Sequence, residues 1–97
     1  MRELKIFCSR DLEDRVVEAL DGAGVEGFLH VGEATGHQFA ARGELPRTIS
    51  WEASLFVVPA LDEDKVRAVQ NELAAYAGRC EVEPCLRMVV GSVERMI

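Results

Sequence analysis

The chain has 97 residues and a formal net charge of −6, and 48% of its residues are hydrophobic. This length and apolar content fit a single domain, residues 1–97, with an ordinary small core. The acidic balance argues against a nucleic-acid partner, which would need clustered Lys and Arg. No apolar run approaches the ~20 residues that span a bilayer, and the first residues lack a signal-peptide pattern, so we expect a cytoplasmic protein.

The first third of the chain predicts a strand, a helix and a second strand. Polarity alternates over Leu4–Cys8, which is typical of a strand. Apolar residues then recur at helical spacing from Leu12 to Ala23, and Gly22 and Gly24 end this helix. A second strand is expected over Glu26–Glu33.

The longest strand pattern runs from Thr48 to Pro59, with strict alternation between two faces. We expect Pro59 to end this strand, because proline has no amide proton for the sheet. The polar stretch before it, residues 35–47, is longer than the two to five residues that a tight hairpin needs. We therefore interpret 35–47 as a functional loop, with a merely mobile loop as the alternative.

The last third predicts a second helix and a fourth strand. Asp62 begins the helix, Gly78 ends it, the strand lies near Cys85–Val90, and Gly91 separates it from a tail, 92–97. The order β-α-β-β-α-β predicts an α+β ferredoxin-like fold, in which two helices cover one face of a four-stranded antiparallel sheet.

The predicted strands carry apolar residues on both faces, although the helices cover only one. A soluble monomer seldom exposes so large an apolar surface, so we expect a homo-oligomer that buries the second face. The two opposed sets are taken as Phe7, Phe28, Phe56, Val58 and Val89 on one face, and Leu4, Leu29 and Leu55 on the other.

Three cysteines give little indication of chemistry. Cys8 ends the first strand and is expected to be a small buried hydrophobic residue. Cys80 and Cys85 are separated by four residues, which is the spacing of neither redox motifs nor common zinc sites. In a reducing compartment we expect no structural disulfide framework.

Short motifs follow one another along the chain: G-H-Q at 36–38, R-G at 42–43, L-P-R at 45–47, V-V-P at 57–59, V-E-P at 82–84, and Arg87 with Gly91. Their order resembles the nitrogen-regulatory PII family and its PII-like relatives, whose T-loop opens with G-R-Q and whose last strand carries R-x-R-x-G. His37 replaces the arginine of G-R-Q, and Val89 replaces the second arginine of R-x-R-x-G.

The resemblance implies a non-enzymatic homotrimer for signal transduction in nitrogen regulation, with ligand clefts between subunits. It implies a small anionic ligand, such as an adenine nucleotide, and a loop over 35–47 that contacts a membrane transporter or an enzyme. Cationic side chains would meet the anion, and Thr35 and Gln38 would position it. The implied ligand-binding residues are Thr35, Gly36, His37, Gln38, Arg42, Arg47, Arg79 and Arg87.

Two departures from the family pattern favour a ligand of lower charge than ATP. The T-loop is short, and the connection after the second helix lacks the glycine- and lysine-rich loop that cradles phosphates. Glu81 and Glu83 lie close to the cations Arg79 and Arg87 in the sequence and would repel a triphosphate.

Two other classes of function stay open. CutA relatives share the trimeric fold and are linked to divalent metals, and Glu33, His30, His37, Cys80 and Cys85 offer ligand types that suit copper or zinc. An enzyme is the weaker hypothesis, because no Ser-His-Asp order, H-x-E…C-x-x-C pattern or P-loop occurs.

Overall fold

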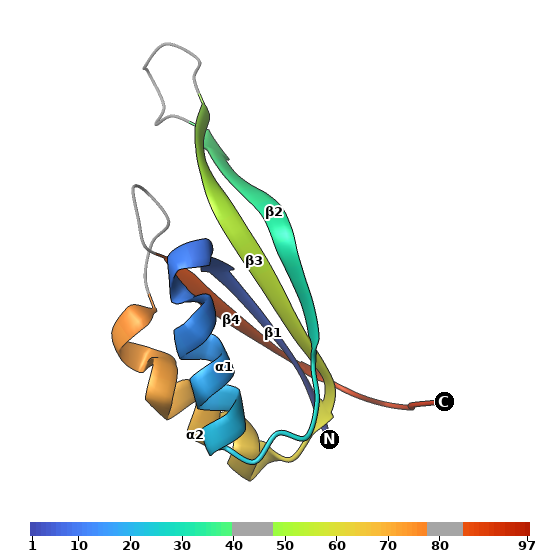
Figure 1. Ribbon diagram of the computed structural model, residues 1–97. Coiled ribbons are helices and arrows are strands. Elements are labelled where there is room, and N and C mark those ends of the chain that lie inside the picture. The colour runs from blue at the N-terminus through green and yellow to red at the C-terminus, as the bar shows by residue number, and fades with distance from the viewer. Residues whose placement is uncertain (40–47, 78–84) are drawn as a thin grey trace.

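The computed structural model describes residues 1–39, 48–77 and 85–97 (Figure 1). Four strands, two α-helices and two short 3-10 helices follow one another along the chain. They are β1 (Arg2–Ser9), η1 (Arg10–Leu12), α1 (Glu13–Gly22), β2 (Leu29–Phe39), β3 (Thr48–Leu61), α2 (Glu63–Leu73), η2 (Ala74–Tyr76) and β4 (Leu86–Ser92). None of the helices in these ranges is long and apolar enough to cross a membrane.

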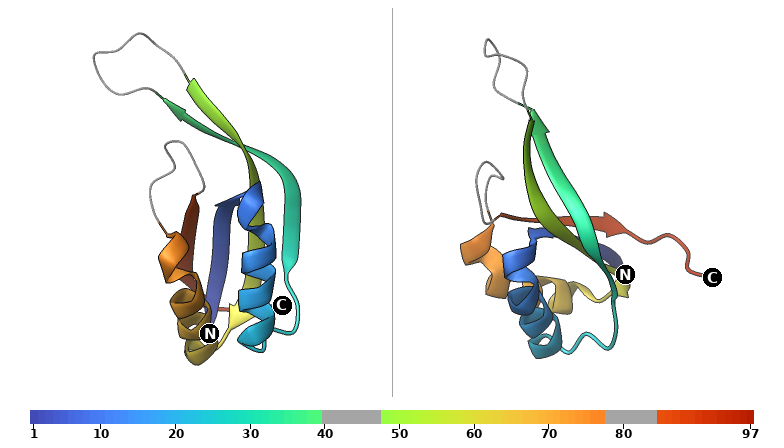
Figure 2. Two further views of the ribbon diagram at one scale, coloured as in Figure 1. Left: turned by 60° about the vertical axis from the view of Figure 1, so that its left-hand side comes forward. Right: turned by 45° about the horizontal axis from the view of Figure 1, so that its top comes forward.

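The strands form one sheet in the order β2-β3-β1-β4, and every neighbouring pair is antiparallel. Both α-helices cover the same face of this sheet (Figures 1 and 2). This is the ferredoxin-like α+β arrangement that the order of elements predicted, and it is confirmed.

The core lies between the helices and the covered face of the sheet. Alternate residues of β1 and β3, and Leu86 of β4, enter it, as the period of two requires. Its largest fully buried side chains are Phe56, Leu4, Ile6, Leu20, Leu73, Leu86, Val16, Val66 and Val69.

The other face of the sheet, here called the open face, is apolar and uncovered in the single chain. Phe7 is 44% exposed, Leu29 62%, Val31 44% and Val89 52%. The register places Leu55 between Phe7 and Val31, and Val57 between Lys5 and Leu29, so these side chains form cross-strand rows.

The assignment of residues to the two faces was partly wrong. Phe56 and Val58 were placed opposite Leu4, but all three lie in the core. Leu29 and Leu55 were placed with Leu4, but the register puts them on the open face beside Val57 and Phe7. Alternation within one strand does not say how its two faces match those of its neighbours, and the pairing register decides this.

The bounds of three strands also differ from expectation. β3 continues through Pro59 to Leu61, because the β1–β3 register shifts between Arg2 and Leu4 and leaves Pro59 at an irregularity that needs no amide proton. β4 continues through Gly91, which pairs with Glu3. β2 begins at Leu29 and extends to Phe39, past a second register shift between Val31 and Ala34.

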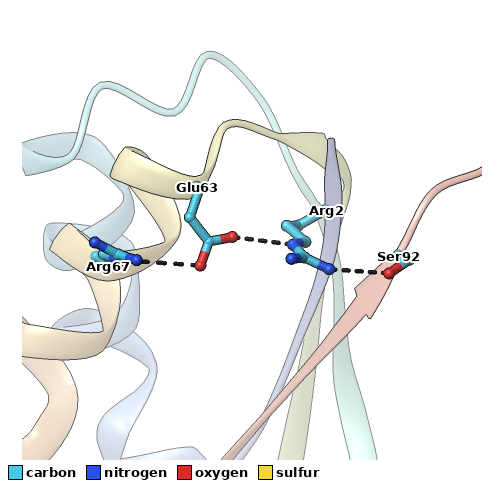
Figure 3. A network of polar contacts seen from close by, with 4 residues as sticks. All are labelled: Arg2, Glu63, Arg67 and Ser92. Atoms are coloured by element: carbon cyan, nitrogen blue, oxygen red, sulfur yellow. Dashed lines mark hydrogen bonds and ion pairs between the residues drawn. The ribbon is translucent and has the colours of Figure 1, made fainter.

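A polar network at one end of the sheet ties three elements together (Figure 3). Arg2 of β1 donates from Nε to Glu63 Oε2 at the start of α2, over 3.0 Å, and from Nη1 to Ser92 Oγ of β4, over 2.9 Å. Arg67 Nε lies 3.8 Å from the other oxygen of Glu63. These contacts connect the end of β4 with β1 and with the start of α2.

Ser9 makes the corresponding connection at the other end of β4. Its amide donates to the carbonyl of Cys85, over 2.9 Å, and its hydroxyl accepts from the amide of Cys85, over 3.2 Å. Cys85 is disulfide-bonded, which corrects the expectation of no structural disulfide. That expectation rested on cellular redox conditions, which do not determine the geometry of the chain.

Candidate functional site

The β2–β3 hairpin projects beyond the helices and the other two strands (Figure 2). Pairing of β1 with β3 ends at Ser9 opposite Ala53, whereas β2 stays paired with β3 out to Phe39 opposite Thr48. We call residues 35–38 of β2 and 49–52 of β3 the hairpin root. The root holds four of the predicted ligand-binding residues, namely Thr35, Gly36, His37 and Gln38.

These four residues were expected in a loop, but they belong to β2. Thr35 pairs with Glu52, Gly36 with Trp51, His37 with Ser50 and Gln38 with Ile49. The register shift after Val31 realigns β2 with β3, so that pairing continues past Glu33. The expected loop 35–47 is therefore strand over 35–39, and residues 40–47 lie outside the described part of the chain.

The root has a polar face on the side of the sheet that carries the helices. His37 Nδ1 lies 3.0 Å from Ser50 Oγ, and both side chains are exposed. Thr35 is directly across from Glu52. Arg10 Nη1, from η1, lies 3.2 Å from Glu52 Oε1 and connects the root to the body of the domain.

The opposite face of the root is formed by Trp51. Its indole ring packs directly on the backbone of Gly36, and a Cβ atom at position 36 would clash with the ring. Trp51 is half-buried, and lies outside the core described above. The root is thus polar on one face and aromatic on the other.

Below the root, a polar cluster lies between α1 and the sheet. Glu13 accepts a hydrogen bond from the buried Ser54 hydroxyl, and its Oε1 lies 3.6 Å from His30 Nε2. The His30 ring stacks on Phe56 with centroids 4.2 Å apart and planes 6° apart. Burial, followed by the nearby Glu13 charge, raises the pKa of the Cys8 thiol from 9.0 to about 11.

This cluster contains serine, histidine and glutamate but not in a catalytic order. In a nucleophilic triad the histidine lies between the hydroxyl and the carboxylate, so that it accepts the hydroxyl proton. Here Glu13 lies between Ser54 and His30. The geometry fits a structural connection from α1 to the hairpin, and Ser54 has no adjacent base of the required kind within this cluster.

The predicted cations are not gathered at the root within one chain. Arg87 is exposed on β4, opposite Phe7, in the same row as Leu55 and Val31. β4 and β2 are the two edges of the sheet, so three strand spacings, about 14 Å, separate Arg87 from β2. Arg42, Arg47 and Arg79 lie outside the described residues.

The predicted metal ligands are also dispersed. Glu33 and His37 are four residues apart in an extended strand, which corresponds to roughly 13 Å. The sulfur of Cys85 is in a disulfide, and Cys80 lies outside the described residues. The described ranges contain no group of three or more His, Cys, Asp or Glu side chains that could hold a metal ion.

The sequence patterns did not identify Arg10, Ser50 and Glu52 as residues of the site, whereas Trp51 could be expected either in the core or lining a cleft. The alternation in β3 already placed Ser50 and Glu52 on one face and Trp51 on the other. No local signal connected Arg10 with Glu52, because the contact joins elements 42 positions apart in sequence.

No family model matches the chain, and no curated protein matches it either. Solved structures do match. A structure of CPII, a nitrogen regulatory PII-like protein from Thiomonas intermedia K12, bound to ADP, AMP and bicarbonate, superposes with a TM-score of 0.63 at 19% identity. The match covers 99% of this chain and 94% of that one.

Two further CPII structures from the same organism agree. One, also bound to ADP, AMP and bicarbonate, gives a TM-score of 0.64 at 20% identity over 93% of this chain and 88% of that one. The other, bound to ADP and bicarbonate, gives 0.60 at 18% identity over 97% and 88%. Identity this low shows the fold alone, and the chain has the fold of a PII-like protein.

Proposed function

We propose that this protein is a non-enzymatic PII-like regulator, a homotrimer that binds a small anionic ligand in clefts between its subunits. The ligand that fits best is an adenine nucleotide of low charge, AMP or ADP. The hairpin root holds it, and the segment 35–47 transmits its presence to a partner, such as a transporter or an enzyme. A cytoplasmic location and a role in nitrogen regulation stay predictions.

The observation that carries the proposal is the separation of the candidate ligand residues within one chain. Thr35 to Gln38 lie on the outer part of the hairpin, and Arg87 lies on the opposite edge of the sheet. A second copy could supply the cation that the root lacks. The apolar open face, with Phe7, Leu29 and Val89 exposed, is the kind of surface that such an assembly buries.

The ligand class is supported by charge and by the likeness in fold. CPII was solved with ADP, AMP and bicarbonate. In this chain the root carries Glu52, already paired with Arg10, and the sequence after α2 adds Glu81 and Glu83. Because carboxylates repel phosphate, each further phosphate group is less favourable, so AMP and ADP should bind more tightly than ATP.

Light scattering and calorimetry together test the proposal. We expect the mass of a trimer at micromolar concentration, and binding heat with AMP and ADP that exceeds the heat with ATP. Bicarbonate is titrated alone and after AMP. Arg87→Ala should weaken nucleotide binding, whereas Arg95→Ala, an exposed arginine beyond β4, serves as the matched control. A monomer, or no heat with any of these ligands, would contradict the proposal.

A CutA-like metal-binding function is the alternative, and it has less support. Among the four described candidate ligands Glu33, His30, His37 and Cys85, no three lie together in a group that could hold a metal ion. A zinc titration of the wild type beside His37→Ala separates the two functions, because equal stoichiometry in both proteins removes His37 as a ligand.

A further inference from the structure

The contact between Trp51 and Gly36 is closer than any other residue type at position 36 would allow. A Cβ atom built on Gly36 would lie 2.5 Å from both Cζ2 and Nε1 of the indole, whereas real Cβ atoms essentially never approach within 3.0 Å. The ring therefore rests on the backbone of β2 itself, at the centre of the candidate ligand-binding segment.

Gly36 is required by this ring and not by the backbone. Within the described residues, the only glycine with a positive φ is Gly24, at 78°. Position 36 is thus in a conformation that alanine also adopts, and alanine would be entropically favoured there if the ring were absent. The cost of a side chain at position 36 comes from Trp51.

A second contact holds the next residue from the opposite face. His37 Nδ1 and Ser50 Oγ are 3.0 Å apart on the helix side, and Trp51 covers Gly36 on the open face. Ser50 and Trp51 are consecutive residues of β3, and their partners His37 and Gly36 are consecutive residues of β2. Side chains of β3 therefore contact β2 on both faces of the sheet, at Gly36 and His37.

We propose that Trp51 and Ser50 are positioning residues that keep residues 35–38 extended and in register before any ligand binds. This inference rests on the proposed function, in which residues 35–38 bind the ligand. The two contacts would preorganise that segment for binding. A segment ordered in advance loses less conformational entropy on binding, so affinity is higher than for a loose hairpin. Trp51 would then control affinity through Gly36.

A double-mutant cycle tests the coupling, with AMP affinity as the measurement. Gly36→Ala should weaken AMP binding about tenfold, a size within the range of coupling between contacting residues. Trp51→Ala should also weaken binding. The double variant should bind AMP no more weakly than Trp51→Ala alone, because the methyl group has room once the ring is gone.

The chain contains a single tryptophan, so its fluorescence reports on the contact directly. Gly36→Ala should shift the emission to longer wavelength, because the displaced indole becomes more exposed to water. Gly32→Ala is the matched control on the same strand, since a Cβ there meets the His30 ring at an ordinary 3.5 Å. It should change neither the emission nor AMP affinity. Ser50→Ala should weaken AMP binding without the emission shift.

Additive effects of Gly36→Ala and Trp51→Ala on AMP binding would overturn the inference, as would unchanged affinity in both single variants. If the wild type binds neither AMP nor ADP, the proposed function fails, and amide hydrogen exchange at 35–38 decides the coupling alone. Exchange that is faster in Gly36→Ala than in the wild type, and slower again in the double variant, would support the coupling of Trp51 to Gly36. Equal exchange in all variants would refute it.

Discussion

Phe56 and Leu55 are neighbours in β3, but their side chains point to opposite sides of the sheet. Phe56 is fully buried between the sheet and the helices, in contact with the rings of Phe28 and His30. Leu55 lies between Phe7 and Val31 on the open face, where both of those neighbours remain exposed. The covered face is thus completed within one chain, whereas the open face stays uncovered in it.

The largest effect should come from the covered face. Phe56→Ala should lower the free energy of unfolding by about 3–5 kcal/mol, because it removes transfer energy and leaves a cavity at the centre of the core. Urea unfolding measures this loss, which should be the same at low and high protein concentration.

Leu55→Ala is the matched variant on the open face. It should cost about 1 kcal/mol within the chain, since the side chain is only partly buried there. A further cost should appear as protein concentration rises, because assembly stabilises the folded state by mass action. If both variants behaved alike at every concentration, the distinction between the two faces would be lost.

The open face should be disrupted most by a charge at its centre. Phe7 lies on the inner strand β1, between Arg87 and Leu55, so Phe7→Asp would place a carboxylate in any interface that forms there. We expect the mass by light scattering to fall to that of one chain, while circular dichroism retains the fold.

Val17→Asp provides the comparison on the helix side, where Val17 is similarly exposed at 38%. It should leave the assembly intact. Loss of assembly in both variants would indicate general destabilisation and would argue against an interface on the open face.

The covered face also contains a titratable group, Cys8. Burial, with Glu13 nearby, raises the pKa of its thiol from 9.0 to about 11, so above pH 9 the unfolded chain releases this proton before the folded one. The contribution of Cys8 to stability is therefore complete below pH 9 and is lost progressively as the pH rises to about 11, by about 2–3 kcal/mol in total.

The measurement compares wild type with Cys8→Ala in urea across that range of pH. The difference in unfolding free energy should shrink from pH 9 to pH 11, and subtracting the variant removes the titration of other groups. A difference that stays constant with pH would show that the thiol is not shielded from water.

The order of elements and the ferredoxin-like fold could be predicted because each element carries a local pattern. The alternation in β3 indicates a strand, and the helical spacing from Val16 to Leu20 indicates a helix. Neither pattern depends on how the two segments pack against the rest of the chain. The assignment of Phe56 and Leu55 to their faces failed, because it depends on a register set by pairing between strands. The prediction that β3 ends at Pro59 failed for the same reason. A shift in the pairing of β1 with β3 allows a proline within the strand.

The candidate site was predictable only in part. The motif G-H-Q predicted the opening of a loop, but residues 36–38 are paired with β3 as part of β2. The Trp51–Gly36 contact could not be read from the sequence, because position 36 pairs with position 51 only after the register shift near Val31. Contacts such as Arg10 with Glu52 depend on the docking of η1 beside β3, which no local pattern encodes.

The smallest effect should come from the polar rim of the covered face, represented by Arg2. Its partner Glu63 and Arg2 itself keep 47% and 43% of their side-chain surface exposed, so water weakens their attraction. Arg2→Ala should therefore cost at most about 1 kcal/mol, and the cost should diminish in high salt. Urea unfolding at low and high salt measures it, with Arg67→Ala as the control that keeps the bond to Ser92. A loss near that of Phe56→Ala would mean that this rim holds β4 in place, and that the apolar centre alone does not determine the stability of the covered face.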